Sequence, residues 1–459
     1  MLVVSPLPQC PLPVGDIPTY VFGAAAQHWD RVALVDGGSG LQLTASDIYQ
    51  TAMRLAAGLV RAGYGGRVVS TFADSELQCV YVYFAALMAG GTYQSLCPGL
   101  PADAVRCCVE RSQTPVVFTT AARLAQLRAA ISGLDVAMFV LDGADECGSN
   151  GQPFAELLVD DPGFVPTRII TRSEAIAKPA LLACRSGPHG NVLRPLALSH
   201  YGLLSWCRFA VPPALPPARP RTAVSAVPLA ESGGIATLAQ FPILTASCVV
   251  QLRSSDPATC LAALEQWQAE SFFATHDVLA AIAAKARSPA TGRIAIADTV
   301  YDVRALQAVY TRTLHAPRAF KDRVAALLGA RLVELYGYAE TGTIAGLITE
   351  HPRIEGSVGL LCPGVSARVV LAGNDVADGG FGEILVSTPR LLSATGDPEY
   401  FSTGDYGTVT ADGVVVIRAR MEDLVHLRAG SLAAPADVEP DRQAMQQQAN
   451  HGSSPAQHG

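Results

Sequence analysis

Four short segments of this 459-residue chain carry charged or polar side chains that could bind a nucleotide, at 186–194, 335–342, 400–407 and 417–425. The first three also contain glycines. Turns rich in glycine present backbone N–H groups to phosphates. Carboxylates hold Mg²⁺ or the hydroxyls of a ribose, and arginine pairs with phosphate. Each segment therefore has a nucleotide-binding interpretation beside an ordinary structural one.

The first segment is a loop between two strand-like runs at 180–184 and 196–200. It offers Ser186, Gly187, His189 and Gly190, and Arg194 stands at its end. Such a loop supplies N–H groups and one cation to a polyphosphate. The alternative is a plain surface turn, because glycine-rich turns are common.

The second segment follows a predicted strand at 331–335 and contains Tyr336, Gly337 and Glu340. Ligands bind at the carboxyl ends of strands in open α/β sheets, so this segment is well placed for a site. There an aromatic ring stacks on a purine and a carboxylate holds Mg²⁺ beside phosphates. The alternative is a core tyrosine and a solvated glutamate.

The third and fourth segments contribute Asp405 and Arg420. An aspartate held in a tight turn accepts hydrogen bonds from the two hydroxyls of a ribose, and an arginine adds ribose or phosphate contacts. The alternatives are an Asx-turn at Asp405 and a charge that faces water at Arg420.

The elements that must position these residues alternate between helix and strand. The apolar spacing at 45–62 predicts an amphipathic helix with Ser46 or Thr44 as its cap and Gly63 as its stop. Further strands are predicted at 67–72, 115–120, 135–141, 222–227 and 247–252, and further helices at 76–88, 121–131, 235–241 and 258–269. This alternation predicts parallel βαβ units with helices on both faces of a sheet.

From Gly356 onward the pattern changes to short strands, at 366–370, 382–386 and 414–417. The turn signals at 372–375 and 411–413 are typical of connections between antiparallel strands. A proline-dense stretch at 212–220 predicts an extended surface loop, and the polar stretch from 440 to 459 predicts a disordered tail.

Composition excludes several classes of protein. The chain is 49% hydrophobic and 16% charged, which is not typical of a disordered protein. Lys+Arg 33 against Asp+Glu 40 give a net charge of -7, which argues against a nucleic-acid partner. The 11 cysteines have neither metal-site spacing nor a disulfide pattern. Without a signal peptide, an apolar run long enough to span a membrane, or a C-terminal peroxisomal tripeptide, the sequence predicts a soluble cytoplasmic protein.

In this order, the four segments resemble the adenylate-forming (AMP-binding) superfamily, which includes acyl-CoA ligases, 4-coumarate–CoA ligase and luciferases. The resemblance covers about 18–439, nearly the whole chain, and its most specific part is Thr403-Gly404-Asp405 with Arg420 at the family spacing. It implies an α/β fold: two doubly wound α/β subdomains, a smaller β-rich subdomain and a small C-terminal domain.

The resemblance also implies roles. Residues Ser186, Gly187, His189 and Gly190 would form the phosphate loop, with Arg194 near the position of the family lysine. Tyr336 and Gly337 would line the adenine pocket, Glu340 would coordinate Mg²⁺, and Asp405 would hold the ribose with help from Arg420. Glu422 stands at the family hinge, while Glu231, Gly234 and His276 fall on the acyl-substrate side.

Several positions depart from the family pattern. Pro188 and His189 replace two hydroxyl residues of the phosphate loop, and Ala339 replaces a threonine. Glu231 stands where the family has a histidine, which places a carboxylate near an anionic substrate. Bulkier residues, Leu314 and His315, replace two glycines of the acyl-pocket wall.

The largest departure is the expected lack of the small C-terminal domain and its lysine, since no lysine follows Lys321. The resulting division is an extension at 1–17, an α/β core at 18–355, a β-rich subdomain at 356–420, a remnant of the hinge and C-terminal domain at 421–439, and the tail.

Two main functions remain open, beside a remote third, an α/β nucleotide binder unrelated to this superfamily. One is a ligase of secondary metabolism that uses ATP, Mg²⁺ and CoA to activate a fatty or aromatic carboxylic acid. The other is a catalytically impaired homologue that binds a nucleotide, an acyl ligand or a protein partner.

Overall fold

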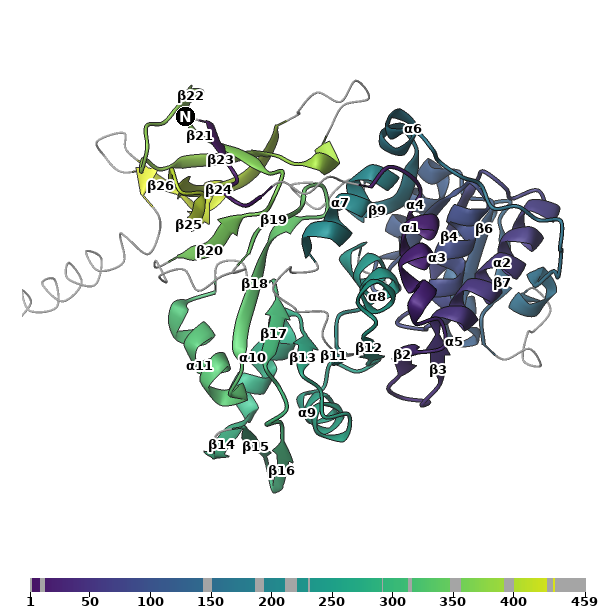
Figure 1. Cartoon of the computed structure of the whole chain (residues 1–459), viewed down its shortest axis with the longest axis horizontal. Coiled ribbons are helices and arrows are strands. Elements are labelled where there is room, and N and C mark those ends of the chain that lie inside the picture. The colour runs from purple at the N-terminus through teal and green to yellow at the C-terminus, as the bar shows by residue number, and fades with distance from the viewer. Residues whose placement is uncertain are drawn as a thin grey trace, which may run out of the picture.

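The computed structural model describes residues 2–8, 13–142, 151–185, 194–210, 221–229, 232–290, 292–312, 316–346, 356–391, 400–426 and 432–433. Two parallel sheets form the α/β body, and a β-rich unit continues the second of them (Figure 1). Two minor sheets consist of β14 (Arg287–Ala290), β15 (Arg293–Ile296) and β16 (Thr299–Asp302), and of β26 (Val425–His426) and β27 (Leu432–Ala433).

The first sheet has seven strands in the order β10-β9-β5-β4-β6-β7-β8. Their bounds are β10 (Arg194–Ser199), β9 (Pro179–Arg185), β5 (Thr92–Leu96), β4 (Val68–Phe72), β6 (Val116–Thr119), β7 (Ala137–Val140) and β8 (Gln152–Pro153). All pairs are parallel except β10 with β9. The connecting helices are α2 (Ala45–Arg61), α3 (Gln78–Met88), α4 (Ala102–Ser112) and α5 (Ala121–Ala130). The strands and helices predicted in this region are confirmed to within a few residues.

Helix α2 shows why these boundaries could be read from sequence. Thr44 caps the helix by accepting from the Asp47 N–H, and the Asp47 side chain accepts from the Thr44 N–H in return. This capping box satisfies two backbone donors that the first turn leaves free. The apolar positions Ile48 and Leu55 are completely buried, and Gly63 adopts a positive φ of 83° just after the helix.

The second parallel sheet runs in the order β18-β17-β13-β11-β12-β2, with β3 antiparallel at the edge. Its strands are β18 (Arg331–Tyr338), β17 (Ala308–Thr311), β13 (Ser271–Phe273), β11 (Thr222–Ser225), β12 (Cys248–Gln251), β2 (Val32–Asp36) and β3 (Gln42–Thr44). Its helices are α8 (Ser232–Thr245), α9 (Pro257–Gln266), α10 (His276–Lys285) and α11 (Arg318–Leu328).

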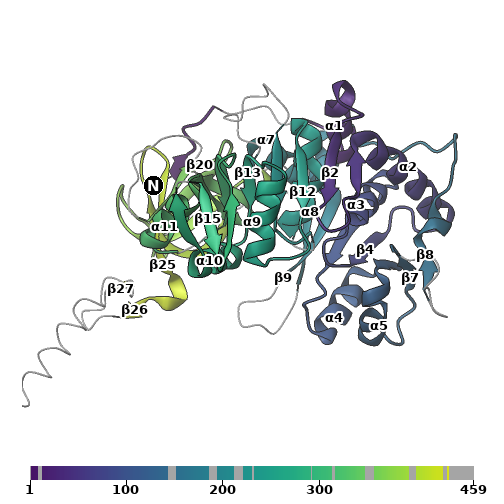
Figure 2. The ribbon, with the colours of Figure 1, turned by 90° about the horizontal axis from the view of Figure 1, so that it is seen from below.

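The largest hydrophobic core lies between the two parallel sheets. It joins Leu34 of β2 and Val249 of β12 to Val69 of β4 and Leu181 of β9. Helices α1 (Ile17–Ala24), α3 and α8 contact one another within it. Ten of the eleven side chains of α3 are buried, since this helix is covered on all sides. Separate cores bury α9–α11 against the second sheet and α4 and α5 against the first, so both sheets are covered on both faces (Figure 2).

The β-rich unit is not a separate sheet. Strand β18 pairs in parallel with β17 on one side and antiparallel with β19 on the other, so one 15-stranded sheet contains both units. The further strands are β19 (Gly342–Gly346), β20 (Ser357–Leu361), β25 (Val414–Arg420), β24 (Phe401–Val409), β23 (Gly382–Ser387), β21 (Ser366–Leu371), β22 (Asn374–Asp375) and β1 (Leu2–Val4). The expected turn at 372–375 is confirmed, because Ala372 and Gly373 both have positive φ and join β21 to antiparallel β22.

Strand β1 was not predicted from the sequence. Residues Leu2–Val4 pair antiparallel with β21, and the Ser5 N–H donates to the Val365 carbonyl at 3.0 Å. Val3 is 5% exposed and belongs to the β-rich core. The first residues of the chain therefore lie in the β-rich unit, whereas α1 and α2 lie in the α/β body (Figure 1).

Two further helices complete the α/β body, α6 (Arg172–Ala177) and α7 (His200–Ala210). His200 is buried, and its Nδ1 accepts from the Ile17 N–H at 3.3 Å. Burial lowers the pKa of His200 to about 4, so its ring is a neutral acceptor that ties α7 to the start of α1. No helix in the described ranges is both long and apolar enough to cross a membrane. The predicted loop at 212–220 and tail at 440–459 lie outside the described residues.

Candidate functional site

Tyr336 and Gly337 lie at the carboxyl end of β18, where the strand turns into β19. The register of the two strands shifts between Tyr336 and Gly337, which is the mark of a β-bulge. A Cβ at Gly337 would lie 1.9 Å from the Gly342 carbonyl oxygen, so only glycine allows the two strands to approach this closely. The bulge brings Tyr336 and Tyr338 to the same polar cluster.

Asp405 lies on β24, directly opposite Arg420 on β25. Gly404, next to it, has a φ of +68°, and a Cβ there would lie 2.9 Å from a guanidinium nitrogen of Arg420. The Asp405 N–H donates to Thr403 Oγ1 at 3.1 Å, and that hydroxyl donates to the Ile384 carbonyl at 2.7 Å. The backbone around Asp405 is therefore held by the neighbouring strand.

The side chains of Tyr336, Tyr338 and Arg420 all bind the Asp405 carboxylate, which is 0% exposed. Tyr336 donates to Oδ2 at 2.7 Å, Tyr338 donates to the same oxygen, and Arg420 Nη1 donates to Oδ1 at 2.8 Å. Arg420 Nη1 also lies 2.7 Å from the Tyr338 hydroxyl and 2.9 Å from the Thr403 carbonyl. We call these four residues (Tyr336, Tyr338, Asp405 and Arg420) the Asp405 cluster.

Charge and burial fix the protonation of this cluster. Burial, and then the negative charge of Asp405, raise the pKa of both Tyr336 and Tyr338 above the ordinary value. Burial lowers the pKa of Arg420, but the hydrogen bond and charge of Asp405 outweigh it, so the net shift is upward. Both phenols are thus neutral donors and the guanidinium is charged, which together compensate a fully buried carboxylate.

Glu340 follows two residues after Tyr338 and is 7% exposed. Thr341 shapes this turn, since its hydroxyl accepts from the Tyr338 N–H at 3.0 Å and donates to the Gly342 carbonyl at 3.0 Å. Thr388 Oγ1 donates to the Thr341 carbonyl at 3.0 Å from a different segment. The described residues contain no group of three or more His, Cys, Asp or Glu side chains that could hold a metal. A Mg²⁺ at Glu340 would therefore fit only as an ion that takes its other ligands from phosphates and water, as Mg²⁺ commonly does.

The predicted phosphate loop is not among the described residues. Ser186, Gly187, His189 and Gly190 lie outside the described residues, as does Glu231 on the substrate side. Arg194 begins β10, opposite Arg185 of β9.

Two other predicted substrate residues are described. Gly234 lies in the first turn of α8, and a Cβ there would lie 2.1 Å from the Pro228 carbonyl oxygen, so the backbone makes a close approach. His276 begins α10 after the carboxyl end of β13, and its ring centroid lies 5.1 Å from that of Phe320 on α11. Their roles toward a substrate remain predictions.

Glu422, the predicted hinge residue, lies in a short 3₁₀ turn at Met421–Asp423, directly after β25. Its side chain is 75% exposed, and its Oε1 lies 4.0 Å from Arg420 Nε. This contact contributes little stability at such exposure. Position and exposure are compatible with a hinge, which stays a prediction.

A second cluster of an arginine with carboxylates lies where the two parallel sheets meet. Asp36 ends β2 and Arg253 follows β12, whose Gln251 pairs with Asp36. Arg253 Nη2 lies 2.6 Å from Asp36 Oδ2, and Arg253 Nη1 lies 3.2 Å from Glu76 Oε1, just before α3. We call Asp36, Glu76 and Arg253 the Arg253 cluster.

The two carboxylates of the Arg253 cluster differ in their hydrogen bonds. Asp36 Oδ1 accepts from the N–H groups of Gly38 and Ser39 at 2.8 and 2.9 Å. Burial alone would raise the pKa of Asp36, but these bonds and Arg253 hold it below the ordinary value. Glu76 is 6% exposed, its Oε2 has no hydrogen-bond partner among the described residues, and burial raises its pKa. Sequence analysis did not identify this cluster, although Glu76 and Arg253 follow the strands predicted at 67–72 and 247–252.

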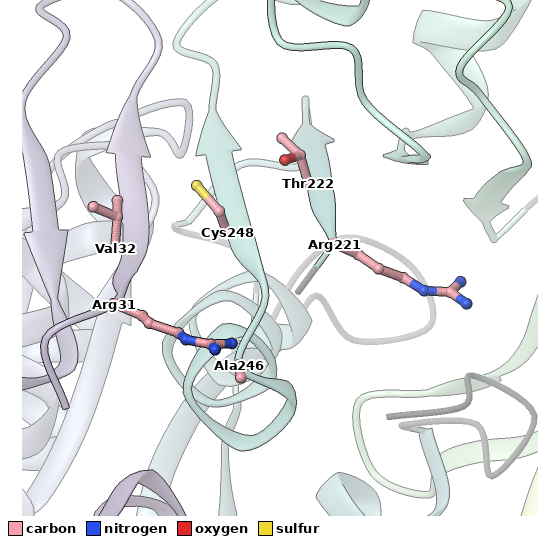
Figure 3. A pocket seen from close by; sticks show the side chains of 6 residues that line it. All are labelled: Arg31, Val32, Arg221, Thr222, Ala246 and Cys248. Carbon is pink, nitrogen blue, oxygen red and sulfur yellow. The ribbon is translucent and has the colours of Figure 1, made fainter. Parts of the chain in front are cut away.

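An open depression of about 420 Å³ lies on the second sheet at the amino ends of its strands, the end away from the Arg253 cluster (Figure 3). It is lined at the amino ends of β2, β11 and β12 by Arg31, Val32, Arg221, Thr222, Ala246 and Cys248. Figure 3 shows the Arg31 side chain reaching toward Ala246, while Arg221 points away from it. Because ligands of open α/β sheets bind at carboxyl ends, this depression is not the expected nucleotide site.

Two parallel α/β units joined to a β-rich unit, with the Asp405 cluster at their junction, define an adenylate-forming type of fold. The family model of AMP-binding enzymes matches residues 21–394, and the chain belongs to this family.

Three named ligases are similar to this chain at low sequence identity. The chain is 24% identical over 384 residues to the acyl-CoA ligase AFT1-1 of Alternaria alternata, covering 79% of this chain and 64% of that protein, which is less than two thirds of its length. It is 22% identical to the peroxisomal OPC-8:0-CoA ligase 1 of Arabidopsis thaliana, covering 95% of this chain and 80% of that protein. It is 24% identical to 4-coumarate–CoA ligase 5 of Oryza sativa subsp. japonica, covering 93% and 79%.

Solved structures support the fold. The luciferase-like enzyme of the mealworm Zophobas morio superposes with a TM-score of 0.76 at 18% identity, covering 92% of this chain and all of that one. ATP-bound MatB from Rhodopseudomonas palustris superposes with a TM-score of 0.72 at 20% identity, covering 92% and 83%. The fold class predicted from sequence is thus confirmed, as is the similarity to acid–CoA ligases.

Proposed function

We propose that this chain binds ATP with the ribose at Asp405 and converts a carboxylic acid into an acyl-adenylate. The observation that carries the proposal is the Asp405 cluster. In it, the fully buried carboxylate of Asp405 lies opposite Arg420 and beside the carboxyl end of β18. Such a carboxylate is suited to accept the two hydroxyls of a ribose.

In the proposed reaction, a carboxylate oxygen of the acid attacks the α-phosphorus of ATP. The bond from that phosphorus to the oxygen bridging to the β-phosphate breaks, and pyrophosphate leaves with the electron pair. Catalysis of this kind rests on positioning and on neutralising phosphate charge. A second step would transfer the acyl group from AMP to the thiol of CoA.

The residues take the roles that the family pattern suggests. Tyr336 and Gly337 border the adenine side, and Glu340 holds Mg²⁺. The 186–190 loop and Arg194 bind the phosphates. Gly234, His276 and Glu231 border the acid, and Glu422 marks the hinge. Relatives named acyl-CoA and 4-coumarate–CoA ligases favour a fatty or aromatic acid, and a place in secondary metabolism is part of the proposal.

The second candidate is a homologue that binds a nucleotide or acyl ligand, or a protein partner, without turnover. One observation favours it: three protein side chains already occupy the Asp405 carboxylate. A ribose must compete with them, so nucleotide binding is expected to be weaker than at an open carboxylate.

The test is exchange of labelled pyrophosphate into ATP, dependent on an added carboxylic acid, over a panel of fatty and aromatic acids with Mg²⁺. Exchange with at least one acid supports the ligase. Asp405→Asn should abolish it, whereas Asp375→Asn, in an exposed pair with Arg368, should leave it unchanged. No exchange with any acid but ATP binding by calorimetry supports the second candidate. If ATP does not bind either, the nucleotide site itself is contradicted.

A further inference from the structure

Tyr338 has no role in the proposed reaction, yet it is central to the Asp405 cluster. Its hydroxyl donates to Asp405 Oδ2 and accepts from Arg420 Nη1 at 2.7 Å. The Arg420 guanidinium also lies 5.9 Å from the centre of its ring, within the range of a cation–π contact. The side chain therefore contacts both residues expected to bind a ribose.

The donors around Asp405 leave too little room for a ribose. A carboxylate offers about four acceptor positions. Tyr336, Tyr338 and Arg420 together use at least three of them. Because the two neighbouring hydroxyls of a ribose need two positions, one of the three side chains must give way when a nucleotide binds.

Of these three donors, Tyr338 is the side chain that can move away from Asp405 with the least disturbance of the surrounding packing. Tyr336 is 1% exposed and belongs to the β-rich core. Arg420 is anchored independently by the Thr403 carbonyl at 2.9 Å. Tyr338 is only partly buried, and its ring lies 5.8 Å from that of Phe401 at the start of β24.

We propose that Tyr338 sets the affinity of this site for the neighbouring hydroxyls of a nucleotide's ribose, because its own hydroxyl holds the Asp405 position that a ribose hydroxyl takes. This inference rests on the proposed function. Nucleotide binding then requires Tyr338 to move off Asp405, and the apparent affinity falls by the fraction of molecules in which it has done so. The phenol is protonated and able to donate at neutral pH, since burial and then Asp405 raise its pKa.

The experiment compares the wild-type chain with Tyr338→Phe, which removes the hydroxyl and keeps the ring. Calorimetry measures the Kd of AMP and of 2′,3′-dideoxy-AMP, which lacks both ribose hydroxyls. Tyr338→Phe should bind AMP about tenfold more tightly, the equivalent of one hydrogen bond of about 1.4 kcal/mol to a charged group. Its Kd for the dideoxy nucleotide should not change, because that ligand does not compete for Asp405.

The matched control is Tyr406→Phe on β24, whose ring contacts Phe381 and whose hydroxyl takes no part in the Asp405 cluster. It should leave both Kd values unchanged. If Tyr338→Phe binds AMP no more tightly than the wild type, or tightens both nucleotides equally, the inference is wrong while the proposed function stands. If no variant binds AMP, the proposed nucleotide site is wrong and the inference fails with it.

Discussion

The Asp405 cluster and the Arg253 cluster both place one arginine among buried side chains near strand ends, but their hydrogen-bond balance is opposite. Around Asp405, three donors serve a single carboxylate that is 0% exposed. Around Arg253, one guanidinium with 45% of its side chain exposed is shared by two carboxylates, and one oxygen of Glu76 has no hydrogen-bond partner within the described part of the chain.

This difference separates two kinds of polar site. Excess donors stabilise a buried carboxylate, and a ligand that needs two of its acceptor positions must displace a donor. Excess carboxylates leave negative charge in a low-dielectric environment, which the protein relieves by raising a pKa. Removing the negative charge of Asp405 should therefore destabilise the chain, whereas removing that of Glu76 should stabilise it.

Asp405→Asn should give the largest effect. It leaves Arg420 without its buried counter-ion and forces an amide among three donors, so we expect a loss of about 3–5 kcal/mol in the free energy of unfolding. Urea unfolding followed by circular dichroism measures it. Asp375→Asn, in the exposed pair with Arg368, should cost less than about 1 kcal/mol. Equal costs at both sites would contradict the account of Asp405 as a buried carboxylate held by several donors.

Asp36→Asn should have an intermediate effect, a loss of about 2 kcal/mol in the free energy of unfolding at neutral pH. The amide oxygen can still accept from Gly38 and Ser39, and Arg253 keeps Glu76. Since the pKa of Asp36 is lower in the folded state than in the unfolded chain, its contribution to stability is present above the unfolded pKa and is lost as pH falls through the folded value.

The difference between the wild type and Asp36→Asn should therefore shrink on acidification. Urea unfolding at about pH 7 and at about pH 3 measures the change. A difference that is constant with pH would show that the Asp36 charge contributes nothing.

Glu76→Gln should have the smallest effect and the opposite sign, a gain of less than about 1 kcal/mol at neutral pH. Burial raises the pKa of Glu76, so its ionisation costs stability as pH rises from the unfolded value of 4.5 through the folded value. Glutamine keeps the shape and an oxygen for Arg253. The gain, measured by thermal unfolding, should vanish as pH falls below 4.5.

Glu334→Gln is the matched control for this substitution. The Glu334 side chain is 7% exposed and lies 2.8 Å from Lys321 Nζ, so this buried carboxylate is paired with a cation. This substitution should destabilise the chain. If Glu76→Gln costs as much, Glu76 is a stabilising partner of Arg253 and the contrast between the two clusters is wrong.

The alternation of helices and strands was predictable because each element carries a local signal. The Thr44 capping box and the spacing of Ile48 and Leu55 define α2 without reference to the rest of the chain. Strand β1 has no such local signal, because its three apolar residues form a strand only by pairing with the distant β21. That β18 joins two units into one sheet was equally invisible, since pairing on both edges of a strand is a tertiary property.

The candidate site was predictable in part. Glycine and charge spacing identified Asp405 and Arg420, and their pairing across β24 and β25 brings them together. Tyr338 was not singled out, although alternate residues of a strand share a face and Tyr336 already stood in the predicted site. The Arg253 cluster was not identified, because Asp36, Glu76 and Arg253 come from three separate segments whose contact depends on how the two sheets pack.

The pairing of β1 with β21 also sets an order of events during synthesis. Leu2 is synthesised long before Arg368, its partner in this pair of strands. At translation rates of about 5–20 residues per second, these apolar residues wait on the order of 20–70 s for their partner. The α/β body can assemble in the meantime, so closing the edge of the β-rich unit is a late step in the biogenesis of this protein.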